Sequence, residues 1–528
     1  MSIDSSVSIT KSFKNFFLGT FFSRISGLLR DVLMAFFFGA SAHVAAFMVA
    51  YRFANLFRRL IGEASLQAGF IPHYENLRLE DKKKAAFFYR DLFFSISLLL
   101  IGIITFSEIF LFSFTNLNKE IIQLTQIMSF GLLFICLYAI NSAFLQCHQS
   151  YFLPSIAPVS FNIIWILSCL LFRNLSDEKF VYVLAIFVVI AFLFQYLTTA
   201  LSSFKIISKE LSFKELFKFK LFSPEIKALI KPITLSILGI GAVQINSALD
   251  ALFATFSEKE GAAYLWYAMR LYQLPLALFA IAISSAILPP LTRAYKTQDF
   301  TSFKKFFNLA IAKSFALMFP ATICLILIGP SLVNLIFARG SFKLDALINT
   351  SYCLYGYAIG LSFASFIMII SQAFYAKKHY FIPTISAVLS VLLNIILNSI
   401  FIFIFNMQSM SVAISTSISA LFNFLLLSYF LKKRFLKIFD KFLFTSFFKI
   451  ILCSSLAALA TFLIGYVLKD PSIYFLVNMS QNFPTKFLTK INSFLTLSIT
   501  YITTLFISAY LLKSKEIIDL IFLKNKLA

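Results

Sequence analysis

The chain has 528 residues, of which 60% are hydrophobic and 13% are charged, and its formal net charge is +23. Soluble domains carry about 25% charged residues, so this composition excludes a soluble globular protein and predicts an all-α polytopic membrane protein. The lysines and arginines are spread through short loops between apolar segments. The positive charge therefore indicates membrane topology, and no nucleic-acid partner is expected.

Apolar stretches of about 20 residues, enough for one membrane crossing, recur along the chain. About 14 transmembrane helices are expected, at residues 13–39, 43–71, 87–114, 121–147, 152–173, 180–204, 225–256, 261–290, 306–337, 345–376, 380–405, 409–431, 443–468 and 491–513. With a cytoplasmic N-terminus, most lysines and arginines of the loops fall on the cytoplasmic side. This bias predicts that both termini are cytoplasmic.

An internal repeat predicts two lobes. Residues 143–156 (AFLQCHQSYFLPSI) and 373–385 (AFYAKKHYFIPTI) share Ala-Phe, Tyr-Phe, Pro and a final Ile, and residues 45–53 resemble residues 262–271. Both matches are offset by six expected helices, an even number, which predicts two six-helix lobes related as a parallel repeat. The expected parts are an N-terminal lobe at 1–204, a basic cytoplasmic linker at 205–224, a C-terminal lobe at 225–431, and two further helices with a cytoplasmic tail at 432–528.

Charged residues lie inside the first two expected spans. An arginine at the centre of a membrane helix costs roughly 2.5–3.5 kcal/mol, so such residues should line water or a polar ligand. In the second span Arg52, Arg59 and Glu63 share one helical face, and Arg58 is turned about 100° away from it. The alternative for the second span is that its arginines lie near a helix end and extend to the headgroups. That alternative does not suit Arg24 and Arg30, which straddle the middle of the first span, with Asp31 beside them.

Arg270 is the arginine well inside a span of the second lobe, near the position that the repeat assigns to Arg52. Two lobes would then present arginines to a common interface, where transporters place their substrate. The planar guanidinium suits phosphate oxygens, so a phosphorylated anion is the expected ligand.

These residues also carry a family resemblance. SRISGLLRD at 23–31, NLFRRLIGEASLQAGFIP at 55–72, NSALDALFAT at 246–255 and the segment at 267–291 resemble the MurJ/MviN family, the lipid II flippases of bacterial cell-wall synthesis. The resemblance implies the fold of the multidrug/oligosaccharidyl-lipid/polysaccharide exporters, with a groove for the undecaprenyl tail along the last two helices. It implies a multi-pass protein of the bacterial inner membrane, working as a monomer, that flips lipid II to the outer leaflet by alternating access.

The resemblance also implies that Arg24, Arg30, Arg58 and Arg270 touch the diphosphate-sugar headgroup and that Glu63 orients them. The full expected substrate site consists of Ser23, Arg24, Arg30, Asp31, Arg52, Arg58, Arg59, Glu63 and Arg270. Family members often have Asp where this chain has Ala45 and Met269. Those two departures put an acid–arginine latch at these positions in doubt.

A monovalent-cation site is expected in the second lobe. It would combine a carboxylate, two amides, a backbone carbonyl and a hydroxyl from Asp250, Asn394, Asn398, Val412 and Thr416, all hard oxygen ligands. These residues resemble a sodium site of the family, with Asn398 where an acid can occur. The alternative is that Asp250 is protonated or bonded to Asn246 while the asparagines hold helices together. No cofactor other than Na⁺ is expected.

Two other functions are conceivable for a polytopic membrane protein of this kind. An enzyme of lipid-linked sugar chemistry needs an acidic metal site or a nucleophile with its base, and the sequence has neither an Asp-x-Asp motif nor clustered histidines. A cation-coupled exporter of the same superfamily, for a drug or for another lipid-linked oligosaccharide, is closer. A drug site of that kind should favour acids and aromatic rings over arginines. The sequence therefore predicts a transporter and not an enzyme.

Overall fold

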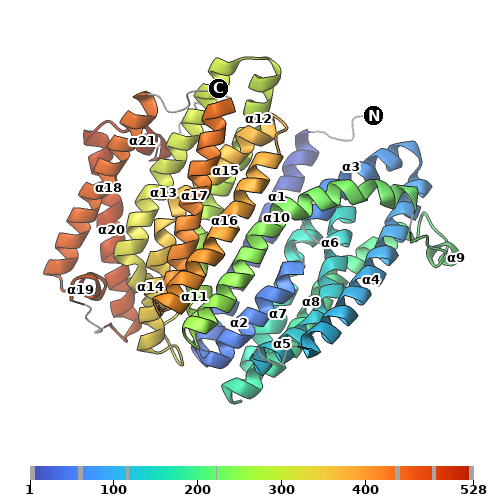
Figure 1. The fold of residues 1–528 in the computed structure, drawn as a ribbon, viewed down its shortest axis with the longest axis horizontal. Helices are drawn as coiled ribbons and strands as arrows, with labels where there is room; N and C mark the ends of the chain where they lie inside the picture. Colours follow the sequence, from blue (N-terminus) through green and yellow to red (C-terminus); the bar gives the residue numbers. More distant parts are fainter. Residues whose placement is uncertain are drawn as a thin grey trace. The chain divides into compact units, whose positions relative to one another are not determined.

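The computed structural model describes residues 6–57, 64–113, 118–221, 223–434, 441–478 and 483–521, and every regular element in these ranges is a helix (Figure 1). Contacts divide the chain into a first unit, Met1–Ala251, and a second unit, Leu252–Ala528. The first unit and the helix that crosses the boundary comprise α1 (Ser6–Phe38), α2 (Ala42–Phe57), α3 (Ala64–Glu80), α4 (Lys82–Phe112), α5 (Lys119–Ser129), α6 (Gly131–Cys147), α7 (Phe152–Leu171), α8 (Asp177–Ile207), α9 (Phe213–Leu216) and α10 (Pro224–Ser257).

The second unit continues from the end of α10. Its elements are α11 (Gly261–Pro275), the π-helical turn η2 (Leu276–Ala280), α12 (Ile281–Lys296), α13 (Phe300–Ile336), α14 (Leu344–Ile359), α15 (Leu361–Ala376), α16 (Phe381–Ser399), the π-helical turn η3 (Ile400–Ile404), α17 (Met410–Arg434), α18 (Lys441–Val467), α19 (Pro471–Asn478), α20 (Phe487–Leu511) and α21 (Lys515–Ile521).

Ten helices of the described chain are long and apolar enough to cross a membrane, or eleven when the bent pair α5 and α6 is counted as one span. These ten coincide within a few residues with ten of the predicted segments. The helices α1 and α10 are not among them, although their 33 and 34 residues exceed the length of one crossing. The multi-pass, all-helical architecture predicted from composition is therefore confirmed.

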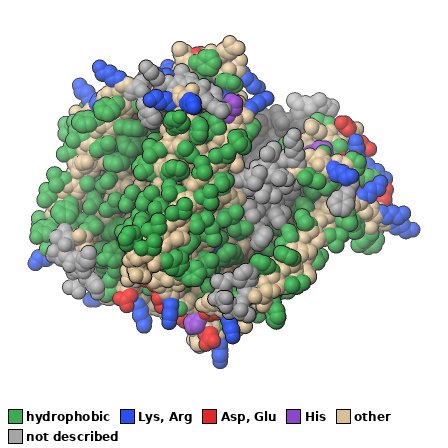
Figure 2. Space-filling model, in the orientation of Figure 1, with side chains coloured by type: hydrophobic (Ala, Val, Ile, Leu, Met, Phe, Trp, Pro, Cys, Tyr) green, Lys and Arg blue, Asp and Glu red, His purple; other side chains and the backbone are tan. Residues whose placement is uncertain are grey.

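Each unit is held together by helices packed side by side. In the first unit α1 lies along α7, and α8 contacts both α6 and α7. In the second unit α13 is central, since it contacts α12, α14, α15, α18 and α20, and Figure 1 shows α18 and α20 side by side. Hydrophobic side chains cover the visible flanks of these helices, while lysines and arginines gather near helix ends (Figure 2). Such wide apolar surfaces are stable only against lipid or another apolar partner.

The sequence repeat has a structural counterpart in each unit. After α6, Gln149 adopts a left-handed φ of 59° and Ser150 N–H donates to the Leu145 carbonyl at 2.9 Å. After α15, Lys378 has the same φ, and His379 N–H donates to the Phe374 carbonyl at 2.9 Å. Both bonds close the Schellman turn that ends a helix. The matching sequences thus encode the same helix–turn–helix junction.

Candidate functional site

Arg30 is buried in α1, as its position in mid-span predicts. Its Nε and Nη2 lie 3.0 and 2.7 Å from Asp31 Oδ1, and the two residues are 6% and 4% exposed. Its Nη1 donates to Asn162 Oδ1 on α7 at 3.1 Å. The guanidinium also lies 4.6 Å from the centre of the Trp165 ring. A carboxylate, an amide and an aromatic face together compensate for the removal of this cation from water.

Asn162 is a site residue that sequence reasoning missed. Besides accepting from Arg30, its Nδ2 donates to the Ser23 carbonyl at 3.2 Å and to Ser26 Oγ at 2.9 Å. One amide therefore fixes α7 to the stretch of α1 that holds Ser23 and Arg30. The available signal was an asparagine in the middle of a predominantly apolar span, because such a group needs a polar partner inside the membrane.

Arg24 is not brought to the same place as Arg30. Its side chain is exposed, whereas that of Arg30 is buried. Six residues along an α-helix turn the side chain by about 600°, which leaves the two arginines about 120° apart around the axis. Within the described first unit, Arg24 and Arg30 thus serve different surfaces of α1.

Arg52 on α2 is 7% exposed, and its Nη1 donates to the Ser247 carbonyl of α10 at 2.9 Å. The predicted face shared by Arg52, Arg59 and Glu63 cannot be traced further, since Arg58, Arg59 and Glu63 lie outside the described residues. In the second unit, the Arg270 guanidinium of α11 stacks over Trp266, with 4.1 Å to the ring centre. The intramembrane arginines that are described and not exposed are thus each held by a specific polar or aromatic contact.

Four of the five predicted cation ligands lie together in the second unit. Asn398 Nδ2 donates to Asn394 Oδ1 at 2.8 Å, Asn394 Nδ2 lies 3.5 Å from Thr416 Oγ1, and Thr416 Oγ1 donates to the Val412 carbonyl at 3.0 Å. Asn394, Asn398 and Val412 are fully buried. These contacts join α16 to α17 through oxygens of the type that bind Na⁺, and they equally satisfy the helix-packing alternative.

Asp250 belongs to the first unit, where it is 1% exposed and accepts a bond from Asn246 Nδ2 at 3.1 Å. This is the bond that the alternative without a cation anticipates. Within the described chain no group of three or more His, Cys, Asp or Glu side chains is placed to hold a metal. A single carboxylate among neutral oxygens suits a monovalent cation better than a divalent one.

A second buried arginine–aspartate pair fixes the linker after α8. Arg90 Nε lies 2.8 Å from Asp91 Oδ1, and its Nη1 donates to the Glu215 carbonyl of α9 at 2.6 Å. Asp91 also accepts from the Lys220 backbone N–H at 3.0 Å. Outside the spans, the Lys83 ammonium lies 2.8 Å from the Glu215 carboxylate, and the backbone N–H and hydroxyl of Ser212 donate to it. These contacts lower the pKa of Glu215 to about 2. The linker is therefore tied to α4 by several charged bonds.

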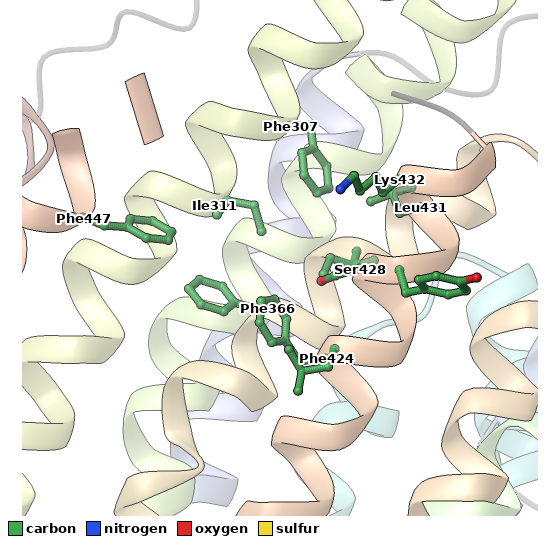
Figure 3. Close-up of a pocket in the computed structure, with 11 residues that line it drawn as sticks. Phe307, Ile311, Phe366, Phe424, Ser428, Leu431, Lys432 and Phe447 are labelled. Carbon is green, nitrogen blue, oxygen red and sulfur yellow. The ribbon is translucent and has the colours of Figure 1, made fainter. Parts of the chain in front are cut away.

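The second unit contains an apolar pocket of about 400 Å³ between α13, α15, α17 and α18 (Figure 3). Aromatic and aliphatic side chains form most of its wall, and one lysine also lines it. The labelled side chains are Phe307, Ile311, Phe366, Phe424, Ser428, Leu431, Lys432 and Phe447. Its volume falls within the range of about 300–1,000 Å³ typical of small-molecule sites. An apolar chain with an anionic end matches this lining.

Comparisons with known proteins agree with one another. The family model described as "Lipid II flippase MurJ" matches residues 34–480. A "probable lipid II flippase MurJ" of Chlamydia trachomatis serovar D is 28% identical over 99% of this chain and 97% of that protein. A protein of the same name from Aquifex aeolicus is 32% identical over 77% of this chain and 80% of its own length.

Solved structures give the same result for the fold. A lipid II flippase MurJ in an inward closed conformation aligns with a TM-score of 0.71 and 26% identity, covering 92% of this chain and 97% of that one. A multidrug-resistance MATE transporter of the MOP superfamily aligns with a TM-score of 0.63 and 14% identity, covering 78% of this chain and 95% of its own, which shows a shared fold. With most of its length matched by the family model, the chain belongs to the MurJ family of lipid II flippases.

Proposed function

We propose that this protein flips lipid II, the undecaprenyl-diphosphate-linked peptidoglycan precursor, from the cytoplasmic to the outer leaflet by alternating access. The observation that carries the proposal is the buried Arg30, which is held by Asp31, Asn162 and Trp165 inside a chain of the MurJ family. A guanidinium fixed in this way is positioned for diphosphate oxygens without first having to be ordered.

The proposed site combines Arg30 and Arg52 of the first lobe with Arg270 of the second, and Arg58, Arg59 and Glu63 complete it around the headgroup, while Arg24 contributes from a different surface of α1. Fourteen spans form two six-helix lobes and two further helices, with both termini in the cytoplasm of the bacterial inner membrane, and the protein works as a monomer. The undecaprenyl tail lies along α18 and α20. The apolar pocket between α13, α15, α17 and α18, which Phe447 of α18 lines, supports the binding of an apolar chain near α18.

Membrane potential is the proposed driving force. Moving negative charge outward across an inside-negative membrane is favourable by roughly 2.3 kcal/mol per charge per 100 mV. A sodium ion at Asp250, Asn394, Asn398, Val412 and Thr416 is proposed to bias the two access states. Val412 would contribute its carbonyl and the others their side-chain oxygens.

Complementation tests the proposal directly. In cells depleted of their own lipid II flippase, the wild-type gene should restore cell-wall synthesis and the Arg30→Ala gene should not, at equal membrane abundance. Accessibility of lipid II to an outer-leaflet reagent then distinguishes flipping from an indirect rescue. Growth without any change in outer-leaflet lipid II would contradict the proposal.

A further inference from the structure

A small cationic cavity lies in the first unit, and none of the arginines proposed for transport is among its lining residues. It measures about 220 Å³ and forms where the turn between α3 and α4 meets the ends of α6 and α8. Its polar lining consists of Tyr74, Arg78, Lys82, His148, Lys209 and Glu210. This volume is below the roughly 300–1,000 Å³ of drug-sized sites, so the cavity fits one compact group.

The charges of this lining do not balance. Arg78, Lys82 and Lys209 bring three positive charges, and Glu210 brings one negative charge. Glu75 lies beyond the lining and forms a surface ion pair with Arg78 at 3.7 Å, which leaves the two lysines as the positive excess. Three cations that share one concave surface repel one another, and they raise the local concentration of anions.

The floor of the cavity is pre-organised. Arg78 Nη1 donates to the Cys147 carbonyl at 2.6 Å, which fixes the guanidinium at the end of α6. The Tyr74 hydroxyl and His148 Nε2 lie 3.0 Å apart. Burial, together with the charge of Arg78, lowers the pKa of His148 to about 4. At neutral pH His148 is thus an uncharged hydrogen-bonding group, and the positive excess comes from the two lysines.

The rest of the wall is apolar and consists of Ala86, Phe144, Ile206 and Ile207. A charged group with short carbon substituents would contact both the polar and the apolar residues of this lining. At the equivalent turn of the second unit, Lys377 lies over Tyr295, Phe300 and Phe303, at 5.4, 5.9 and 4.7 Å from their ring centres. The lysine of that turn is thus covered by aromatic rings, whereas the cavity of the first unit is lined by Arg78, Lys82 and Lys209.

We propose that the cavity between Arg78, Lys82 and Lys209 binds a phosphate group, either of an anionic phospholipid or of dissolved phosphate. The planar guanidinium of Arg78 can donate to two phosphate oxygens, and the flexible lysine side chains bring two ammonium charges. Tyr74 and His148 add hydrogen-bonding groups to the surface. The site contains none of the residues of the proposed transport site.

The test uses the full-length purified protein in detergent at pH 7.5. Five of its six cysteines are buried and all six are free, so a thiol-reactive dye reports unfolding. One arm titrates inorganic phosphate against chloride at constant ionic strength. A second arm adds phosphatidylglycerol, and compares it with diacylglycerol, which has the same chains and no phosphate.

Lys82→Gln/Lys209→Gln is the informative variant, because both side chains are exposed and their removal leaves the Arg78 bond intact. Lys84→Gln is the matched control, since Lys84 is exposed on the same turn of α4, 3.7 Å from Glu80, and does not line the cavity. Each lysine should contribute roughly fivefold to affinity. The additive concentration that gives half of the full thermal stabilisation should therefore rise at least roughly tenfold in the double variant and stay unchanged in the control.

The outcomes are distinct. Stabilisation by dissolved phosphate that the double variant loses identifies a soluble anion as the ligand. Stabilisation by phosphatidylglycerol alone, again lost in the double variant, identifies a lipid headgroup. If the double variant and Lys84→Gln respond to both additives as the wild type does, the phosphate site is refuted.

Discussion

The Arg30 guanidinium binds the carboxylate of the very next residue, with both Nε and Nη2 within 3.0 Å of Asp31 Oδ1. Neighbouring residues point about 100° apart on an α-helix, so the arginine side chain must fold back around the axis to make this contact. Arg90 and Asp91 repeat the arrangement on α4, with Nε 2.8 Å from Oδ1. An Arg-Asp dipeptide in an apolar helix thus carries its own counter-charge.

Asp31→Asn should destabilise the protein by about 3–5 kcal/mol, because it leaves the Arg30 charge buried without its carboxylate. The double variant Arg30→Gln/Asp31→Asn removes both charges and should regain most of the thermal stability. Complementation should still fail in the double variant, since the guanidinium for the headgroup is missing. Normal growth of that variant would show that Arg30 has only a structural role. Arg30→Lys should rescue poorly, because an ammonium lacks the two-pronged geometry of the guanidinium.

Sodium should raise the unfolding temperature of the purified wild-type protein relative to choline at equal ionic strength. Asp250→Ala should abolish this difference, because it removes the one carboxylate of the proposed ligand set. Asn394→Ala should weaken it through loss of an amide oxygen. An equal response of wild type and Asp250→Ala to the two salts would support the helix-packing interpretation of α16 and α17.

A cysteine placed at Lys84 should be shielded from a membrane-impermeant thiol reagent in intact cells, and one placed at Gln408 should be labelled. Both positions are exposed, so folding does not hide them. The reason is the predicted loop bias, which places the turn before α4 inside and the turn before α17 outside. Permeabilised cells provide the control, in which both positions should react. Labelling of Lys84→Cys but not of Gln408→Cys in intact cells would show that the topology is opposite to the one predicted.

Gly356→Ala should lower stability by about 1–3 kcal/mol. An added Cβ would meet the Ala413 Cβ at 2.7 Å and backbone atoms of Ile414 and Met410 at 3.1 Å, and backbone cannot yield as a flexible side chain can. Gly102→Ala is the matched control, because nothing lies within 4 Å of its added Cβ and alanine favours the helix. Thermal unfolding of the two variants measures the difference. Equal stability of the two variants would show that α14 and α17 can separate without cost.

The contact between Lys83 and Glu215 predicts a dependence on pH with a defined sign. Since the folded-state pKa of Glu215 is lowered from 4.5 to about 2, its stabilising effect is complete above pH 4.5 and is lost as pH falls toward 2. Lys83→Gln should unfold at a lower temperature than wild type at pH 7, and the gap should shrink at pH 3. A gap that is constant with pH would mean that the pair does not hold the linker.

The spans were predictable because one crossing needs about 20 apolar residues, and that pattern is local in sequence. The junctions at Gln149 and Lys378 were also anticipated by the repeat. A break at Pro275 is expected from its proline and is found there as η2, whereas the interruption between α14 and α15 was not predicted. α14 gives way to α15 at Gly360, whose added Cβ would lie 2.6 Å from Ser417 Oγ, a contact that only tertiary structure reveals.

The candidate site was predictable in its cations and not in their partners. A charged residue inside an apolar span is visible in the sequence. The bond from Arg30 to Asn162 is not, because it joins residues 132 positions apart. The contact of Arg270 with Trp266 is different, because residues four apart on a helix are neighbours and the pair was visible in the sequence. The separation of Arg24 from Arg30 likewise follows from helical geometry.

The π-helical turn η2 also has a mechanical consequence. It follows Pro275, whose missing N–H and bulky ring weaken the backbone ladder at that point. Arg270 precedes the turn by six residues, or about 9 Å of helix. A rotation of about 10° at η2 therefore shifts the Arg270 backbone by about 1.5 Å relative to α12, half the length of a hydrogen bond. A bend of that size at this weakened turn would be enough to make or break a contact at the guanidinium.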